Sequence, residues 1–324
     1  MTSDETSLFQ GAQGMDDYDL VVVGAGAAGL AAGIYGVRSG LKTVVLEEKL
    51  AGGTTAVAPW VENYLGFERI NGVELAAKMV AHARSAGVKI NEFERVHKME
   101  LKGESKRVYT ERAVYEARAV IIASGAAYRH LGVPGENEFR GRGVSYCGLC
   151  DGPFFKNKRI VVVGGGNTAL ITALYLAHLG SDVKIVHRRD IFRAEDALIQ
   201  DLKSMKNIEV MWNTEIKEIV GDKSVKKVVL FNRRRGETSE IPMDGVFVQI
   251  GEDPNSQQAK EAGLAVDQDG FIIVDGLQHT NINGVYAAGD VSTHPVKQLG
   301  IAVGQGITAA VEAYAFVRRP YYRK

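Results

Sequence analysis

The two cysteines of the chain are separated by two residues, in the segment Cys147-Gly-Leu-Cys150. The disulfide that this spacing closes is a small loop that is easily reduced, and an isolated pair of this kind in a reducing compartment is more often redox-active than structural. Asp151 follows directly and is a candidate proton donor, although an acidic residue also favours the start of a helix. The spacing therefore favours redox chemistry over an inert buried pair.

A metal site is the other chemistry open to two nearby cysteines. A closed zinc site needs four ligands, whereas the chain has no second Cys-x-x-Cys motif and its 7 histidines are scattered. We therefore expect no metal.

A first glycine motif is formed by Gly24, Gly26 and Gly29. It lies between an apolar run expected to be a strand, residues 19–23, and an expected helix over residues 30–39. In this context the glycines allow a tight turn, close approach of backbone N–H groups to a pyrophosphate, and close helix packing. A second strand is expected over residues 42–46, and Glu47 follows it where a carboxylate can accept hydrogen bonds from a free ribose. The first motif therefore suits FAD.

A second motif repeats this order, with an expected strand over 159–163, glycines at 164–166, a helix through Leu179 and a strand over 183–186. The position equivalent to Glu47 carries no acid; the run His-Arg-Arg-Asp-Ile-Phe-Arg at 187–193 stands there instead. Guanidinium groups are what a 2′-phosphate requires, so this motif suits NADPH, with a solvated helix start as the alternative for the arginines. The candidate residues are Gly164, Gly166, Asn167, Thr168, Ala169, His187, Arg188, Arg189 and Arg193.

Length and composition agree with two globular domains. The 324 residues predict about two domains, and Lys+Arg and Asp+Glu both total 39. A net charge of zero argues against non-specific nucleic-acid binding and against a basic membrane-binding surface. Glycine is in excess, with 37 residues where ordinary usage predicts roughly 23. The chain therefore needs backbone without side chains at many positions.

Neither the uncharged stretch 20–37 nor the N-terminal segment 1–16 indicates a membrane span or a secretory signal. The uncharged stretch 20–37 contains five glycines and is interpreted as strand, turn and helix rather than as a membrane span. Residues 1–16 are polar and acidic without an apolar core, so we expect a disordered tail and a cytoplasmic protein.

The remaining segments complete an α/β pattern. Hairpin or meander strands are expected over 113–122 and 225–231, and the Arg-Arg-Arg-Gly run at 233–236 is expected to be a solvated turn, with an anion site as the alternative. Residues 284–290 are expected to be a strand ending in a turn, followed by an apolar helix over 300–317. No linker rich in proline, glycine and serine separates the halves, which suggests that one domain is inserted in the other.

Four segments together resemble the low-molecular-weight thioredoxin reductases: GVSYCGLCDG at 143–152, GGGNTA at 164–169, HRRDIFRA at 187–194 and AAGDV at 287–291. The resemblance covers the chain after the acidic tail. It implies an α/β fold with two Rossmann-like domains, an FAD domain formed by residues 17–126 and 253–324, and an inserted NADPH domain, 127–252, that carries the cysteines. It also implies a homodimer whose partner is thioredoxin or a thioredoxin-like protein.

The resemblance also implies roles for individual residues. Cys150 would face the flavin, Cys147 would attack the partner, and Asp151 would act as acid or base, with domain rotation about hinges near 125–135 and 251–255. Glu62 resembles a residue near the flavin. The residues implied in FAD binding are Gly24, Gly26, Gly29, Glu47, Gly53, Asn63, Gly125, Asp290, Gln298 and Leu299.

Three departures from the family pattern leave alternatives open. Ala27 stands where proline is frequent, Gly148-Leu149 stand where Ala-Thr is usual, and Ile171-Thr172 replace a common pair of acids. The last departure leaves open another electron donor, such as ferredoxin or a deazaflavin. A small-molecule dithiol oxidase would not need the arginine cluster, and a flavin redox sensor without turnover is an alternative of another class.

Overall fold

The structure is a computed structural model that describes residues 15–318. The chain divides into two compact units. Of the described residues, 15–127 and 253–318 form unit 1, and Tyr128–Glu252 form unit 2. Unit 2 is thus inserted between two segments of unit 1.

Unit 1 is built on a seven-stranded sheet in which β1 lies between β2 and β6, all three parallel. The first half of β6 pairs with β5 in antiparallel fashion and its second half with β17 in parallel fashion. The apolar runs are buried on both faces, as expected of parallel strands. The strands are β1 (Met15–Val23), β2 (Thr43–Leu46), β3 (Lys89–Asn91), β4 (Val96–Glu100), β5 (Lys106–Thr110), β6 (Val114–Ile122) and β17 (Val285–Ala287).

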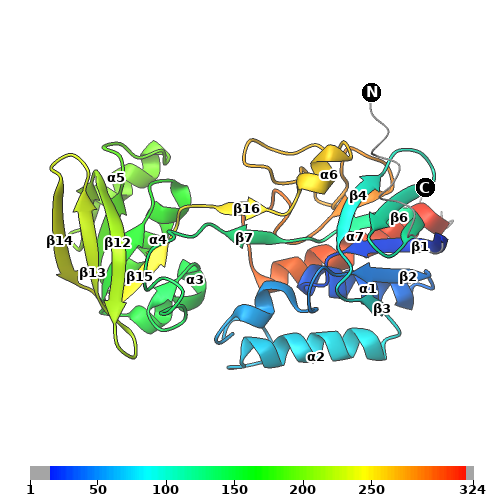
Figure 1. Ribbon diagram of the computed structural model, residues 1–324, viewed down its shortest axis with the longest axis horizontal. Helices are drawn as coiled ribbons and strands as arrows, with labels where there is room; N and C mark the ends of the chain where they lie inside the picture. The colour runs from blue at the N-terminus through cyan, green and yellow to red at the C-terminus, as the bar shows by residue number, and fades with distance from the viewer. Residues whose placement is uncertain (1–14, 319–324) are drawn as a thin grey trace. The chain divides into compact units, whose positions relative to one another are not determined.

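Helices cover one face of this sheet and shorter elements cover the other (Figure 1). On the helical face, Leu20 and Val22 of β1 pack with alanines of α1 and α7, whereas Val21 points to the opposite core with β4 and β5. This alternation is the period of a strand. The helices of unit 1 are α1 (Ala27–Arg38), α2 (Gly72–Ser85), α6 (Gln257–Glu261), α7 (Leu299–Arg318) and the 3₁₀ helix η1 (Gly53–Val57).

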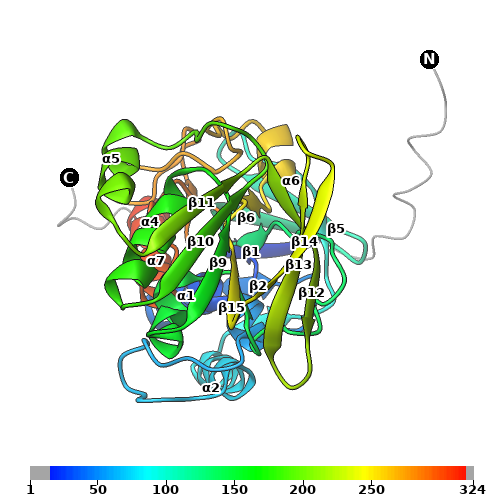
Figure 2. The same ribbon diagram turned by 90° about the vertical axis from the view of Figure 1, so that its left-hand side faces the viewer.

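Unit 2 has three layers (Figure 2). Its central sheet is fully parallel, in the order β11-β10-β9-β15-β8. Ile160 and Val162 of β9 pack against α4 and α5, whereas Val161 and Val163 pack against the antiparallel sheet β12-β13-β14. The elements are β8 (Val144–Ser145), α3 (Gly148–Asp151), η2 (Gly152–Phe155), β9 (Arg159–Val163), α4 (Asn167–His178), β10 (Asp182–His187), α5 (Asp196–Ser204), β11 (Ile208–Trp212), β12 (Thr214–Gly221), β13 (Val225–Asn232), β14 (Glu237–Pro242) and β15 (Gly245–Val248).

The chain passes between the units along two short strands that pair with each other, β7 (Ala126–Tyr128) and β16 (Glu252–Pro254). On the unit 1 side, the Asn255 N–H donates to the Gly125 carbonyl over 3.0 Å. On the unit 2 side, the Arg129 N–H donates to the Gly251 carbonyl over 3.0 Å. Both crossings fall in the ranges expected to contain hinges, and their hinge motion stays a prediction.

Two sequence expectations need correction at element ends. The tail was expected to reach residue 16, but β1 begins at Met15, because the ladder to β6 starts there with Met15 opposite Val114. Residues 1–14 lie outside the described part. The first helix was expected from residue 30 and starts at Ala27, because Gly26 is its N-cap and the motif itself forms the first turn. The solvated turn at 233–236 joins β13 to β14 as expected.

Helix α7 is long and apolar enough to cross a membrane by length and composition alone, with a mean hydropathy of 1.3. A core helix passes the same test, and α7 packs its small residues against α1: a Cβ on Gly306 would collide with the Ala28 carbonyl. The uncharged stretch 20–37 forms the end of β1, the glycine turn and α1. Within the described chain, α7 is the single helix that meets the length and composition test.

Candidate active site

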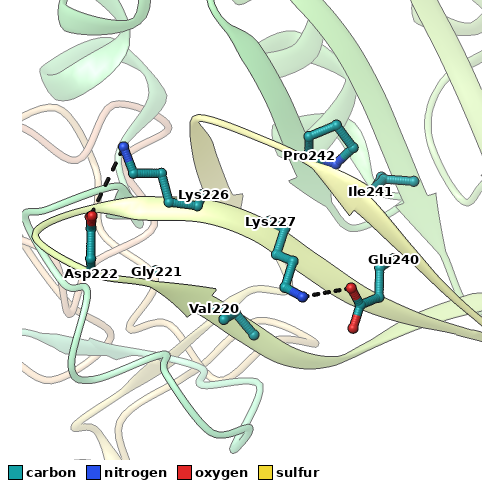
Figure 3. Close-up of a pocket in the computed structure, with 8 residues that line it drawn as sticks. All are labelled: Val220, Gly221, Asp222, Lys226, Lys227, Glu240, Ile241 and Pro242. Carbon is teal, nitrogen blue, oxygen red and sulfur yellow. Dashed lines mark hydrogen bonds and ion pairs between the residues drawn. The ribbon is translucent and has the colours of Figure 1, made fainter.

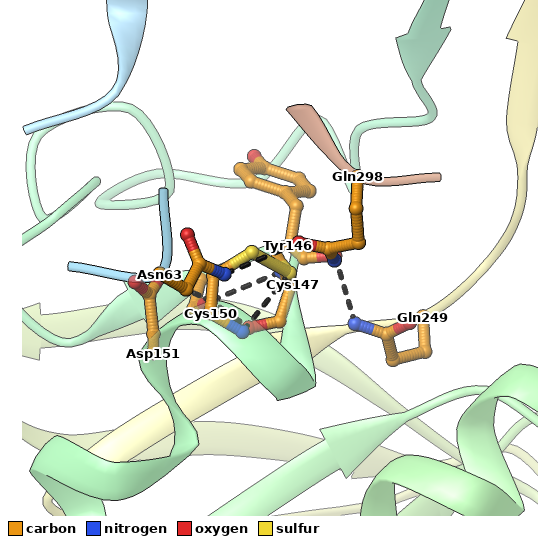
Figure 4. The surroundings of a disulfide bond; sticks show 8 residues. Asn63, Tyr146, Cys147, Cys150, Asp151, Gln249 and Gln298 are labelled. Atoms are coloured by element: carbon orange, nitrogen blue, oxygen red, sulfur yellow. Dashed lines mark hydrogen bonds between the residues drawn. A yellow bond between two sulfur atoms is a disulfide. The ribbon is translucent and has the colours of Figure 1, made fainter. Parts of the chain in front are cut away.

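Cys147 and Cys150 form a disulfide, with an S–S length of 2.11 Å and Cα atoms 5.3 Å apart (Figure 4). Cys147 is the N-cap of α3, and its Sγ accepts a hydrogen bond from the Cys150 N–H over 3.1 Å. A donor at this sulfur favours negative charge on it once the bond is reduced. Both cysteines are half-buried. The arrangement fits a redox pair in which the hydrogen bond would stabilise Cys147 Sγ as a thiolate after reduction.

Asp151 is held by the buried hydroxyl of Ser145. The Ser145 Oγ donates to Asp151 Oδ2 over 2.6 Å and accepts from the Cys147 N–H over 3.1 Å. The Gln249 side-chain amide, which follows β15, donates to the Tyr146 carbonyl over 3.0 Å (Figure 4). The predicted catalytic residues Cys147, Cys150 and Asp151 therefore lie in one hydrogen-bonded turn.

Tyr146 anchors the residue before Cys147 to a buried carboxylate. Its phenol donates to Glu136 Oε1 over 2.8 Å, and the same carboxylate accepts from the N–H groups of Leu131 and Gly132 over 2.8 Å each. The nearby His130 Nδ1 is also 2.8 Å from the phenol oxygen. Burial, followed by the hydrogen bond to Glu136 and then the Glu136 charge, raises the pKa of Tyr146, so the phenol stays neutral. This network ties the redox turn to the loop that opens unit 2.

Two of the departures from the family pattern contact each other. A Cβ built on Gly148 would lie 2.7 Å from Thr172 Cγ2 and 2.8 Å from Thr172 Oγ1. Thr172 is buried on α4, whereas its neighbour Ile171 is 50% exposed. Thr172 therefore occupies the space that an alanine at position 148 would need.

The first glycine motif packs backbone on backbone. Gly24 has φ +105°, and a Cβ on it would collide with the Ala123 carbonyl. A Cβ on Gly53 would lie 2.8 Å from Gly26 Cα, so the turn after β2 touches the motif. The Glu47 carboxylate accepts from the Ala25 N–H over 2.8 Å, which fixes the carboxylate beside the motif. The second carboxylate oxygen of Glu47 accepts from the Lys49 N–H over 2.9 Å.

Other predicted FAD residues gather in unit 1 as well. Asn63 Nδ2 donates to Gln298 Oε1 over 3.1 Å, which joins residues far apart in sequence, and Leu299 is the first residue of α7. Burial raises the pKa of Asp290, and the nearby charge of Lys297 acts against this shift. Gly125 has φ +71° and open space where a Cβ would stand. Glu62 instead pairs with Arg69 over 3.2 Å.

The second glycine motif differs in what it packs against. A Cβ on Gly164, with φ +149°, would collide with the Gln249 carbonyl, and a Cβ on Gly165 would collide with the His187 ring. Gly166 caps α4 in extended conformation and has open space around it. Asn167 exchanges hydrogen bonds with Glu195, with its side chain donating over 2.7 Å and accepting over 2.9 Å. The start of α4, with Thr168 and Ala169, is thereby fixed to the loop after β10.

The basic cluster lies on that loop. Arg188, Arg189 and Arg193 are exposed, and within residues 15–318 their guanidinium groups make no ion pair. The Arg193 N–H donates to the Gly165 carbonyl over 2.8 Å, which brings the loop to the glycine motif. His187 is buried beside Phe192 and Trp212, with Nε2 3.0 Å from the Ile191 carbonyl. Burial lowers the pKa of His187, so this ring supports the loop uncharged. The charges on the loop are those of the three arginines and of the exposed Asp190.

Two hollows lie away from the predicted site residues. An open groove of about 460 Å³ follows the three-stranded sheet of unit 2 (Figure 3), where Lys227 pairs with Glu240 over 2.6 Å. A second hollow of about 550 Å³ lies along α7 in unit 1. No predicted site residue lines either hollow. In the described part of the chain, no group of three or more His, Cys, Asp or Glu side chains is placed to hold a metal ion.

Sequence reasoning assigned no role to Ser145, Glu136 or Gln249. Ser145 could have been found, because it is a hydroxyl-bearing residue two positions before Cys147 in the segment GVSYC at 143–147. Glu136 and Gln249 contact the redox turn only through the tertiary fold.

The chain is similar to known proteins over most of its length. The family of pyridine nucleotide-disulphide oxidoreductases matches residues 18–306. Thioredoxin reductase of Bacillus subtilis is 41% identical over 93% of this chain and 95% of its own length. The solved thioredoxin reductase of Streptococcus pyogenes is 38% identical, covers 94% of this chain and 99% of its own, and superposes with a TM-score of 0.88.

A ferredoxin-flavin thioredoxin reductase of Clostridium acetobutylicum is also similar, at 34% identity over 95% of this chain and all of its own, with a TM-score of 0.52. The expected α/β fold with two Rossmann-like domains and the resemblance to thioredoxin reductases are confirmed. The chain therefore belongs to the pyridine nucleotide-disulphide oxidoreductase family and is an oxidoreductase.

Proposed function

We propose that the chain is a thioredoxin-disulfide reductase that passes electrons from NADPH through FAD and the Cys147–Cys150 disulfide to thioredoxin or a thioredoxin-like protein. The observation that carries the proposal is the disulfide itself, whose Cys147 sulfur accepts an N–H hydrogen bond and whose neighbouring acid is fixed by Ser145. The similarity to thioredoxin reductases over more than nine-tenths of the chain supports it.

FAD fits the residues of unit 1. Gly24, Gly26 and Gly29 leave backbone N–H groups without side chains at the start of α1, and Glu47 stands beside them with carboxylate lone pairs for ribose hydroxyls. Asn63, Gln298 and Leu299 would line the flavin end, with Asp290 and Gly125 along the ribityl and pyrophosphate region. When bound, FAD would accept a hydride from the nicotinamide and return two electrons to the disulfide.

The exchange reaction then follows from the two cysteines. Reduction breaks the S–S bond and, with two protons, leaves two thiols. The Cys147 thiolate attacks one sulfur of the partner disulfide; a mixed disulfide forms, the partner bond breaks and its leaving thiolate takes a proton. The Cys150 thiolate next attacks Cys147 Sγ, which restores the internal disulfide and releases the second partner thiol. Asp151 would hold or deliver the proton.

NADPH as donor is supported by the exposed arginines of the β10 loop, which have no carboxylate partner within residues 15–318. Three guanidinium groups beside a glycine motif suit a 2′-phosphate. We expect the dinucleotide to contact Gly164, Gly166, Asn167, Thr168 and Ala169 at the start of α4, with the phosphate on Arg188, Arg189 and Arg193. The buried His187 ring would support the loop that carries these arginines.

Reduced ferredoxin is the second candidate donor. It is favoured by the apolar Ile171, which replaces an acid and is half-exposed, and by the similarity to a solved ferredoxin-flavin thioredoxin reductase. Such a reductase would not need the arginine cluster, so NADPH remains our proposal.

The partner and setting follow from the same proposal. We infer a cytoplasmic homodimer with no nucleic-acid or membrane partner, in which residues 127–252 form the NADPH domain and rotate about the β7 and β16 crossings. The rotation would let the nicotinamide and the disulfide, both in the inserted domain, reach one flavin face in turn.

A turnover assay separates the candidates. The protein is mixed with oxidised thioredoxin and supplied with NADPH, NADH or reduced ferredoxin, and thiols released are counted. We expect many turnovers with NADPH and far fewer with NADH. Turnover with ferredoxin alone would show that ferredoxin, and not NADPH, is the donor. Oxygen-dependent disulfide formation would indicate a dithiol oxidase. A single turnover with every donor would indicate a sensor.

A further inference from the structure

Ser145 links the backbone of one redox cysteine to the carboxylate beside the other. Its hydroxyl accepts from the Cys147 N–H over 3.1 Å, donates to Asp151 Oδ2 over 2.6 Å, and lies 3.3 Å from the Cys147 carbonyl. A hydroxyl has one proton to donate. The much shorter distance assigns that proton to the carboxylate, and a hydrogen bond to an ionised acceptor is the stronger kind.

The backbone around Ser145 is fixed on both sides. Ser145 ends β8, where it stands opposite Phe247 of the fully buried strand β15. The Val246 N–H donates to the Gly143 carbonyl over 2.8 Å, and the Gln249 amide donates to the Tyr146 carbonyl over 3.0 Å. Ser145 is 4% exposed, so its hydroxyl cannot turn to water without breaking these contacts.

We propose that Ser145 is a positioning residue for proton transfer: its hydroxyl holds the Asp151 carboxylate toward the redox turn while the disulfide opens and closes. The proposal rests on the proposed function, because it gives Asp151 a proton to handle during thiol exchange. Opening the S–S bond frees the two sulfurs to move apart, and Asp151 follows Cys150 directly as the last residue of α3. A hydroxyl attached to the rigid sheet keeps the carboxylate in place while the sulfurs move.

The chemistry involves one proton in each exchange step. The Cys147 thiolate forms a bond to a sulfur of the partner disulfide, the partner S–S bond breaks, and the departing thiolate is protonated. In the second step Cys150 loses its proton, attacks Cys147 Sγ and displaces the second partner thiolate. Asp151, held at Oδ2 by Ser145, is the group that takes the Cys150 proton and passes it on.

The test compares Ser145→Ala with Ser145→Thr, which keeps the hydroxyl. Ser181→Ala is the matched control, because Ser181 is a fully buried serine of the same unit whose Oγ donates to the Phe155 carbonyl over 2.7 Å. Full-length protein as purified is reduced with dithiothreitol, desalted and mixed rapidly with oxidised thioredoxin or with 5,5′-dithiobis(2-nitrobenzoate) across a pH series.

We expect Ser145→Ala to slow thiol oxidation about tenfold, a part of what an acid–base group contributes. Loss of a donor to the ionised carboxylate favours its protonated form, so the inflection of the rate against pH should move upward by about one unit. Ser145→Thr should restore both, and Ser181→Ala should leave the inflection unchanged. In an Asp151→Asn background, Ser145→Ala should have no further effect on the inflection.

Opposite results have distinct meanings. A Ser145→Ala protein that is slower by the same factor at every pH, or that Ser145→Thr does not rescue, has lost only structure, and the proposal is overturned. A wild-type protein that reacts with the small disulfide but not with thioredoxin contradicts the proposed partner, while the pH comparison on the small disulfide still decides the role of Ser145.

Discussion

The two units contain the same strand, glycine turn and helix, yet they differ in the side chains that follow the second strand. After β2, Glu47 turns inward and both its carboxylate oxygens accept backbone N–H groups, one of them from Ala25 in the glycine motif. After β10, Arg188 and Arg189 point to solvent without an acidic partner among the described residues. We therefore propose that the glycines would receive a pyrophosphate in both units, and that the loop after the second strand would distinguish a free ribose from a 2′-phosphate.

The contacts that hold the glycine turn in place also differ between the two units. In unit 1 the acid itself braces the glycine turn, and Gly53 packs directly on Gly26. In unit 2 the brace is the His187 ring under Gly165, together with the bond from the Arg193 N–H to the Gly165 carbonyl. A neutral ring beneath the loop leaves the arginines exposed for an anion, whereas a carboxylate there would neutralise them.

The largest effect should come from removing a thiol of the redox pair, because both cysteines of the chain lie in unit 2. Cys147→Ser removes the sulfur that we propose attacks the partner, so turnover of thioredoxin should fall to background. Reduction of the bound flavin by NADPH, followed by flavin absorbance, should continue at nearly the wild-type rate. Equal loss of both activities would contradict the proposed order of electron transfer. Ser181→Ala is the control for a general effect of mutation on the folding of unit 2.

The arginine loop should control the choice between dinucleotides. Arg188→Ala with Arg189→Ala would remove two charge-assisted contacts to the proposed 2′-phosphate. Because both side chains are exposed and solvent screens their charge, we expect the pair to contribute about 1.4–2.8 kcal/mol together. The KM for NADPH should therefore rise about 10- to 100-fold, while the KM for NADH changes little. Steady-state kinetics with both donors measures the ratio. Arg233→Ala with Arg234→Ala, in the solvated turn after β13, is the matched control, and an equal rise for NADH would remove the 2′-phosphate assignment.

Glu47 should control flavin binding in unit 1 without affecting NADPH. Glu47→Gln replaces a charged acceptor of the Ala25 N–H by a neutral one, so the affinity for FAD should fall about tenfold, or roughly 1.4 kcal/mol. Titration of flavin-free protein with FAD, followed by flavin fluorescence, measures the change. Glu48→Gln is the control, because Glu48 is an exposed neighbour of Glu47 whose ion pair with Arg95 is long, at 3.8 Å, and also exposed. An unchanged affinity for FAD would show that Glu47 does not face the ribose.

Much of the fold could be predicted because its signals are local. Strand β9 and both glycine turns have apolar runs and glycine spacings that few other structures use, and the repeat of this order identifies two dinucleotide folds. Burial of β1 and β2 on both faces also follows from their uninterrupted apolar residues.

The contacts that shape the redox turn could not be predicted in this way. Gln249 reaches the Tyr146 carbonyl across 103 positions of sequence, and Thr172 meets Gly148 because α3 packs on α4. These are tertiary contacts between single residues, with no periodicity to reveal them. The sequence alone showed that Gly148-Leu149 and Ile171-Thr172 depart from the family pattern, whereas the contact between Gly148 and Thr172 is visible only in the packing.

A last effect should be on stability and leave the choice of dinucleotide unchanged, and it concerns the contact between Gly148 and Thr172 in unit 2. Gly148→Ala places a methyl group 2.7 Å from Thr172 Cγ2, and such overpacking costs about 1–3 kcal/mol of unfolding free energy. Adding Thr172→Ala should remove the collision, so the double variant should recover most of the loss, whereas Thr172→Ala alone should destabilise through the space it leaves. Urea unfolding of the four proteins gives the coupling energy. Additive losses would show that the α3 turn moves away from α4 freely, and the two departures would then be independent.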